Sequence, residues 1–201
     1  MTEASRRKER LMAIRIFIDQ GHNPTNPNAG AEGNGLREQD ITYKTGILLG
    51  DLLSSDPNFE VRLSRPTPES VIGTSNSTSL AGRVSAANEW GADYFISIHA
   101  NASSITTALG SEAYVYSLPS VAGDLGEALI GGISEVTGIA PRGVFARPSL
   151  YVLRKTAMPA VLVELGFITT PSEATLMSEE TALYAEGMYL GLLNYFGLVS
   201  D

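Results

Sequence analysis

The sequence contains only two histidines, and each lies at the end of a short apolar segment. His22 follows such a segment in FIDQGHNP, and His99 ends the segment FISIH. Glu164 ends a third apolar segment, AVLVE. In an open parallel α/β sheet, ligands bind beyond the carboxyl ends of the strands. We therefore expect His22, His99 and Glu164 to gather along one edge of a sheet.

These residue types can support zinc-dependent hydrolysis. Two neutral imidazoles and one carboxylate form an open zinc site that leaves a position for water. Zinc in such a site activates the water and polarises a carbonyl group. A separate carboxylate can then move a proton from the water to the leaving amine. The pattern thus predicts hydrolysis of an amide or a related bond. The alternative is that both histidines only satisfy local hydrogen bonds, in which case the protein would bind no stoichiometric zinc.

Two glutamates compete for the third ligand position. Glu32 and Glu38 both follow His22 in the glycine-rich segment AGAEGNGLRE. Glu38 is favoured because it lies at the entry to a predicted helix, where the geometry is fixed. It could also be only a first-turn carboxylate that stabilises the helix dipole. Glu173 is a weaker candidate for chemistry, because Thr170, Pro171 and Glu173 have the spacing of a helix start with a capping box.

Strand and helix patterns alternate along the chain and would position these side chains. Short apolar segments predict strands at residues 14–19, 59–63, 93–98, 111–117 and 160–163. Apolar residues with helical spacing predict helices within residues 41–53, 80–90, 125–137 and 182–196, and a further helix starting near residue 170. Polar segments at 66–79 and 139–149 are expected to be loops. This alternation predicts a three-layer α/β/α fold with a mostly parallel twisted sheet.

Composition excludes several classes of protein. The 201 residues suit one domain, and the absence of cysteine rules out disulfides and thiolate zinc sites. Residues 1–15 hold five basic and two acidic side chains, so nine basic and 20 acidic ones remain in the rest. Such an acidic body is a poor binder of nucleic acid. No apolar run is long enough to span a bilayer. We expect a basic polar extension at residues 1–13, without a visible signal peptide, and a catalytic domain at 14–201.

Five segments in order resemble one known family. They are IFIDQGHNP, GNGLRE, LAGRVSAAN, SIHANA and AVLVELGFIT. Together they resemble the zinc-dependent N-acetylmuramoyl-L-alanine amidases of the amidase_3 type, over residues 14–196. The resemblance implies cleavage of the amide between N-acetylmuramic acid and L-alanine of the peptidoglycan stem peptide, at the bacterial cell wall. It also implies that His22, Glu38 and His99 bind Zn2+ and that Glu164 is the catalytic residue, which favours Glu38 over Glu32.

The sequence departs from the family pattern at several positions. Asn23 and Pro24 follow His22 where the family commonly has two glycines, and Phe145 replaces a residue that is often polar. Thr169 or Thr170 stands where an asparagine is frequent. These changes bear on the choice of stem peptide rather than on the metal. An enzyme without a signal peptide would suit an endolysin or an autolysin released by lysis. The alternatives are another zinc peptidase or deacylase, or a non-catalytic wall-binding domain.

Overall fold

The computed structural model describes residues 13–198 of the chain. The strands are β1 Ile14–Gln20, β2 Glu32–Gly33, β3 Leu36–Arg37, β4 Phe59–Leu63, β5 Tyr94–Asn101, β6 Glu112–Val115, β7 Gly143–Ala146 and β8 Ala160–Phe167. The helices are α2 Glu38–Ser54, α3 Asn76–Trp90, α4 Val121–Thr137, α5 Tyr151–Lys155, α6 Pro171–Glu179 and α7 Thr181–Phe196. The predicted strands and helices are therefore present, with ends that differ by a few residues.

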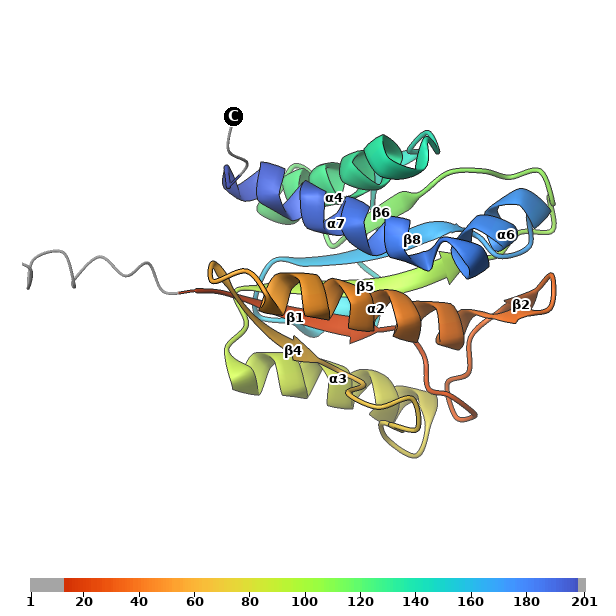
Figure 1. Cartoon of the computed structure of the whole chain (residues 1–201). Helices are drawn as coiled ribbons and strands as arrows, with labels where there is room; N and C mark the ends of the chain where they lie inside the picture. Colours follow the sequence, from red (N-terminus) through yellow and green to blue (C-terminus); the bar gives the residue numbers. More distant parts are fainter. Residues whose placement is uncertain (1–12, 199–201) are drawn as a thin grey trace, which may run out of the picture.

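Six strands form one sheet in the order β4-β1-β5-β8-β6-β7 (Figure 1). The strands β4, β1, β5 and β8 are parallel to one another, whereas β6 pairs with β8 in the antiparallel direction. The central strands β1, β5 and β8 are nearly continuous apolar runs because both of their faces are covered. The prediction of a mostly parallel sheet in an α/β fold is confirmed.

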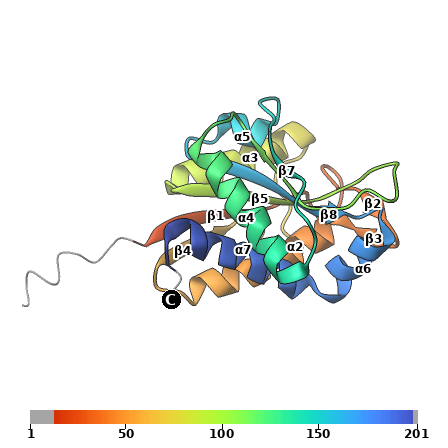
Figure 2. The same ribbon diagram turned by 90° about the horizontal axis from the view of Figure 1, so that it is seen from above.

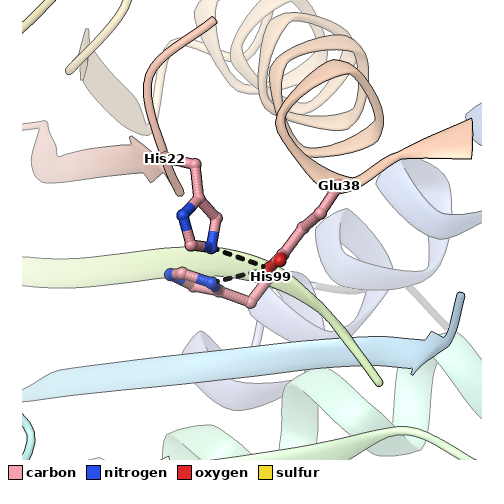
Figure 3. Close-up of side chains that lie close together, drawn as sticks. All are labelled: His22, Glu38 and His99. Atoms are coloured by element: carbon pink, nitrogen blue, oxygen red, sulfur yellow. Dashed lines mark hydrogen bonds and ion pairs between the residues drawn. The ribbon is translucent and has the colours of Figure 1, made fainter. Parts of the chain in front are cut away.

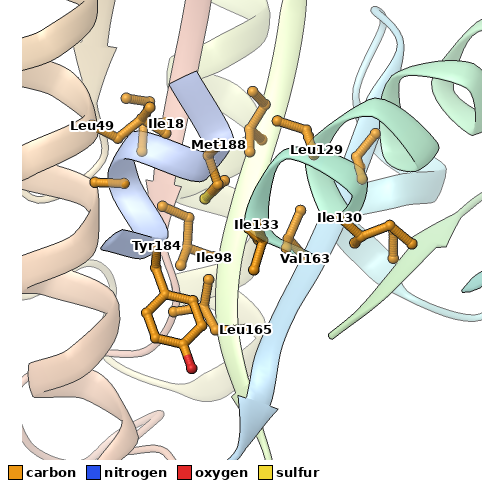
Figure 4. Packing of buried hydrophobic residues seen from close by; sticks show 14 of the residues in the cluster. Ile18, Leu49, Ile98, Leu129, Ile130, Ile133, Val163, Leu165, Tyr184 and Met188 are labelled. Atoms are coloured by element: carbon orange, nitrogen blue, oxygen red, sulfur yellow. The ribbon is translucent and has the colours of Figure 1, made fainter. Parts of the chain in front are cut away.

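Helices cover both faces of the sheet and bury two apolar clusters. One cluster joins side chains of α2, α4 and α7 to the sheet, and Figure 4 shows Leu49, Leu129 and Met188 packed against β-strand residues such as Ile98. The other joins α3 and α5 to the opposite face, around Phe17. Figure 2 shows these two helical layers on either side of the sheet. The three-layer prediction is therefore confirmed.

Some local expectations are wrong. The segment expected to be a loop at 139–149 contains β7, and helix α3 begins at Asn76, inside the other expected loop. The glycine-rich segment around Glu32 forms the short hairpin of β2 and β3. The strands β2, β3 and β7 are too short to give a periodic pattern, and β7 forms only because it finds β6 as a partner. Periodicity in one sequence does not report such long-range pairing.

The capping box expected at α6 is also absent. Pro171 does start the helix, but the Thr170 side chain makes no cap hydrogen bond and instead donates to the carbonyl of Ala108. The Glu173 carboxylate accepts hydrogen bonds from the backbone N–H groups of Gly110 and Phe167, both at 2.7 Å. Tertiary contacts thus replace the local hydrogen bonds that the spacing predicted.

The basic extension expected at residues 1–13 lies outside the described residues, except for Ala13. Within residues 13–198, no helix is both long and apolar enough to cross a membrane.

Candidate metal centre and neighbouring carboxylates

His22 lies in the turn that follows β1. Its backbone has a φ of 68°, in the left-handed region that residues with a side chain rarely adopt. The preceding Gly21 lies against the ring of His99, and a Cβ at Gly21 would come within 2.6 Å of that ring. The glycine therefore lets the turn pass close enough to β5 for the two imidazoles to meet. Their ring centroids are 4.8 Å apart.

Glu38 is the first residue of α2 and points toward both imidazoles (Figure 3). Its Oε1 atom lies 3.1 Å from Nε2 of His22 and 2.9 Å from Nδ1 of His99. The backbone N–H groups of Ala100 and Ala31 donate to its two oxygens, at 3.1 and 2.8 Å. Burial opposes ionisation of this carboxyl, but the two histidines outweigh it and hold the pKa of Glu38 well below its usual range. Glu38 is thus fixed in position as a carboxylate.

The three side chains form a group that could hold a metal ion. One donor atom from each of His22, Glu38 and His99 lies within 4.8 Å of the others. Glu38 is buried, with a side chain 6% exposed, whereas each imidazole is 19% exposed. A hollow beside the imidazoles, lined also by Leu150 and Tyr151, gives access to them. Two nitrogens and one oxygen with an accessible side match the donor set of catalytic zinc sites.

Glu164 lies on β8 beside this group. It pairs in register with His99 of β5 on one side and with Glu112 of β6 on the other. Its Oε2 atom is buried and has no hydrogen-bond partner among the described residues. Burial raises the pKa of Glu164 to about 8, and the charges of Glu38 and Glu112 act in the same direction. A partly buried carboxyl group with an unpartnered oxygen and a raised pKa is a candidate for proton transfer.

The four predicted site residues, His22, Glu38, His99 and Glu164, lie close together. Glu32, the competing ligand, lies exposed in β2 and is not among the metal-competent group. Glu164 does not end its strand as the pattern suggested, because β8 continues to Phe167. His22 and His99 lie together with Glu38, and Glu164 pairs in register with His99 on the adjacent strand, while the roles expected for these residues stay predictions.

Glu112 was not predicted from the sequence as a site residue. Its carboxylate accepts hydrogen bonds from the Tyr114 hydroxyl and from the Arg142 guanidinium. It lies directly opposite Glu164 on the neighbouring strand. The alternation of Glu112 and Tyr114 in β6, continued by Tyr116 just after it, indicates a strand with one polar face, but only the pairing of β6 with β8 brings that face to Glu164.

The residues that depart from the family pattern have defined roles in the loops. Asn23 is buried, and its side chain donates to the carbonyls of Pro27 and Ile72 at 2.8 and 3.0 Å. Thr169 accepts a hydrogen bond from the backbone of Ser103. Phe145 is 37% exposed and lies 6.3 Å from Tyr114, measured between ring centroids. Asn23 and Thr169 thus stabilise loops, while Phe145 presents an aromatic surface on β7.

Comparison with known proteins agrees with this architecture. Residues 16–194 match the family profile described as N-acetylmuramoyl-L-alanine amidase. The chain is 36% identical to the N-acetylmuramoyl-L-alanine amidase CwlM of Bacillus licheniformis, over 92% of this chain and 70% of that protein. It is 32% identical to the endolysin of Bacillus phage SPP1, over 93% of this chain and 68% of that protein.

A solved structure shares the same fold. The crystal structure of an N-acetylmuramoyl-L-alanine amidase from Clostridium difficile 630 superposes with a TM-score of 0.80 at 30% identity. The match covers 94% of this chain and 99% of that one. The profile match over most of the chain, together with these likenesses, shows that the protein belongs to the N-acetylmuramoyl-L-alanine amidase family.

Proposed function

We propose that this protein hydrolyses the amide bond between N-acetylmuramic acid and L-alanine of the peptidoglycan stem peptide. His22, Glu38 and His99 bind a zinc ion, and Glu164 serves as general base and then as general acid. The observation that carries the proposal is the convergence of three metal-competent side chains beside a partly buried glutamate with one inaccessible, unpartnered oxygen, in a chain of this amidase family.

The donor set and its surroundings support zinc. Catalytic zinc sites commonly use imidazole and carboxylate ligands and keep one coordination position open. Because this chain has no cysteine, thiolate ligands are excluded. The two backbone N–H groups that hold the Glu38 carboxylate keep it oriented toward both imidazoles. When bound, zinc would activate a water molecule and polarise the amide carbonyl.

The protein's own groups carry the proton transfer. In its ionised form, which the positive charge of a bound zinc would favour, Glu164 accepts the proton of the attacking water and delivers it to the amine that leaves as the new N-terminus of the stem peptide. Glu164 pairs in register with Glu112 on one side and His99 on the other, and it is not part of the His22, Glu38 and His99 group that could hold a metal ion. This arrangement supports its assignment as proton carrier and not as a ligand.

The names of the relatives support the place of action. CwlM of Bacillus licheniformis is an N-acetylmuramoyl-L-alanine amidase, and the similar protein of phage SPP1 is an endolysin. We infer that this chain acts at the bacterial cell wall, as an autolysin or an endolysin does. We also propose that residues 14–201 form a single catalytic domain. The family profile matches residues 16–194, and both apolar clusters pack against the same sheet.

The test is mass spectrometry of purified peptidoglycan digested with the protein, with and without a zinc chelator. Release of free stem peptides that begin with L-alanine, abolished by the chelator and restored by added zinc, is the expected result. Products cut within the stem peptide would instead identify a peptidase. Absence of products from protein that holds stoichiometric zinc would favour a non-catalytic wall-binding role.

Metal analysis of two variants tests the assigned roles. His99→Ala should lose zinc, because only two donors remain, whereas Glu164→Ala should keep zinc and lose turnover. Normal zinc content in His99→Ala would remove His99 from the ligand set. Loss of zinc in Glu164→Ala would mean that Glu164 is a ligand and that the two roles are assigned wrongly.

A further inference from the structure

Two buried arginines lie directly behind the turn that carries His22. Arg65 follows β4 and Arg83 lies on α3, and each is only 1% exposed. The sequence pattern gave no role to either. Burying a guanidinium is unfavourable unless it is paired or fully hydrogen-bonded. Two such groups side by side behind a candidate ligand therefore call for an explanation.

Both guanidiniums donate to the same backbone atom, the carbonyl oxygen of His22. Arg83 donates through Nη2, and Arg65 through Nη1 at 3.4 Å. His22 has a φ in the left-handed region, which is unfavourable for a residue with a side chain and needs support from its surroundings. The two arginines supply that support at the residue whose orientation decides whether its Nε2 atom faces Glu38.

Arg83 connects the His22 turn to the strand that carries His99. Its Nη1 atom donates to the carboxylate of Asp19 and, at 2.6 Å, to the carbonyl of Gln20. The other oxygen of Asp19 accepts from the Ser97 hydroxyl at 2.8 Å. Ser97 lies on β5, two residues before His99. One guanidinium thus joins the end of β1 and the His22 turn to the strand β5.

Arg65 connects the same turn to the helix that carries Glu38. Its Nη1 atom donates to the carbonyl of Gln39 at 3.0 Å, and Gln39 directly follows Glu38 in the first turn of α2. Its Nη2 atom donates to the carbonyl of Pro68 at 3.2 Å, and the group lies over the ring of Tyr43. Arg65 therefore fixes the His22 turn relative to α2.

We propose that Arg65 and Arg83 are positioning residues that hold the three segments bearing His22, Glu38 and His99 in the geometry needed to bind the metal. This inference rests on the proposed zinc site. A planar guanidinium with several N–H donors in fixed directions suits the task, since it can hold several carbonyls at once and stays charged at every physiological pH. A lysine offers one point charge and would retain only part of these contacts.

The test compares zinc affinity in Arg83→Met, Arg83→Lys and Arg65→Met with that of the unmodified protein, by competition with a chromogenic chelator. The matched control is Leu125→Ala, a cavity variant on the opposite face of the sheet that also loses stability. We expect Arg83→Met to bind zinc about 10- to 100-fold more weakly, as for other groups that orient metal ligands. Arg83→Lys should lose less, and Leu125→Ala should keep its affinity.

A second readout is the visible absorption spectrum of the cobalt(II)-substituted protein, which reports ligand geometry independently of activity. The spectrum should change in Arg83→Met and not in Leu125→Ala. Unchanged zinc affinity in Arg83→Met, or an equal loss in Leu125→Ala, would reduce the two arginines to ordinary stabilising residues. If Arg83→Met does not fold, the same criteria apply to Arg83→Lys and Arg65→Met. An unmodified protein that binds no zinc would overturn both proposals, whereas normal affinity in the arginine variants overturns only this one.

Discussion

Two glutamates at β8, the buried Glu173 of α6 and the partly buried Glu164 of the strand itself, differ in how completely their carboxyl groups are hydrogen-bonded. Glu173, from α6, receives one backbone N–H on each oxygen, from Gly110 and Phe167. Glu164, within the strand, has a buried oxygen without a partner in the described part of the chain, and burial raises its pKa to about 8. The same side chain can therefore stabilise a loop or remain available for proton transfer. What differs is whether the fold supplies hydrogen-bond donors to both oxygens of the carboxyl group.

The sharpest test of this comparison is Glu164→Gln, with Glu173→Gln as the matched variant. The amide keeps the size of the side chain but cannot carry the proton, so kcat for peptidoglycan should fall about 10³-fold, within the usual range for removal of a general base. The melting temperature and the zinc content should stay close to those of the unmodified protein. A Glu164→Gln enzyme that keeps more than a tenth of the normal kcat would contradict the assignment of Glu164 as the group that transfers the proton.

Asp19 extends the comparison to a buried carboxylate that is paired with a cation. Burial alone would raise its pKa, but the Arg83 guanidinium and the Ser97 hydroxyl outweigh this and hold the pKa of Asp19 below its usual value. Asp19→Asn should lower the free energy of unfolding by about 3 kcal/mol at pH 7, because it leaves Arg83 without its counter-charge. Urea denaturation measures this difference.

The stability difference between the unmodified protein and Asp19→Asn depends on pH in a way that follows from the direction of the Asp19 pKa shift. A carboxyl whose pKa is lower in the folded state stabilises the protein above its unfolded pKa of about 3.9, and this contribution disappears as the pH falls through the folded value. The gap between the unmodified protein and Asp19→Asn should therefore be constant from pH 7 to about 5 and narrow below about pH 4. Asp40→Asn, which removes an exposed pair with Arg37, should cost less than about 1 kcal/mol throughout. A gap that widens in acid would contradict the assignment.

Glu173→Gln should change stability and leave catalysis intact. One of the two backbone N–H donors would then face an amide NH₂ in place of an oxygen, and a buried donor without a partner is unfavourable by about 1–3 kcal/mol. Gly166 leaves little room for adjustment, because even a Cβ there would lie 3.0 Å from the carboxylate. Thermal denaturation and kcat per folded molecule measure the two effects. A tenfold fall in kcat without loss of stability would place Glu173 in the chemistry.

Glu112→Gln should give the smallest effect. Glu112 is hydrogen-bonded to Tyr114 and Arg142, so it resembles Glu173, although it lies opposite Glu164. Its Arg142 partner is 44% exposed, and solvent weakens the pair to about 1 kcal/mol or less. We expect less than a tenfold change in kcat/KM and a small loss of stability. A loss of kcat as large as that of Glu164→Gln would give Glu112 a direct part in the reaction.

Much of the site could be predicted because its residues are marked by local pattern. A chain with two histidines, each at the end of an apolar run, leaves few choices for a metal site, and the strands that carry His99 and Glu164 are long apolar segments. Their ends must meet at one edge of a parallel sheet.

The supporting residues could not be predicted in the same way. Arg83 lies on the same face of α3 as Leu80 and Ala87, and an arginine at a core-facing position of a helix was an available signal of a buried polar network. Its partners, however, are the carbonyls of Gln20 and His22, more than 60 residues away. No spacing within one helix indicates which distant carbonyl a guanidinium will meet.

The sequence by itself determined the fold class, the family and the residues suited to bind a metal, because apolar periodicity and residue chemistry are local properties of the chain. Only the tertiary structure decided which buried groups are satisfied. It gave Glu173 two backbone partners in place of a helix cap, left an oxygen of Glu164 without one, and placed two arginines behind His22. Hydrogen bonding between distant segments depends on strand pairing and loop closure, and these are set by the packing of the whole domain.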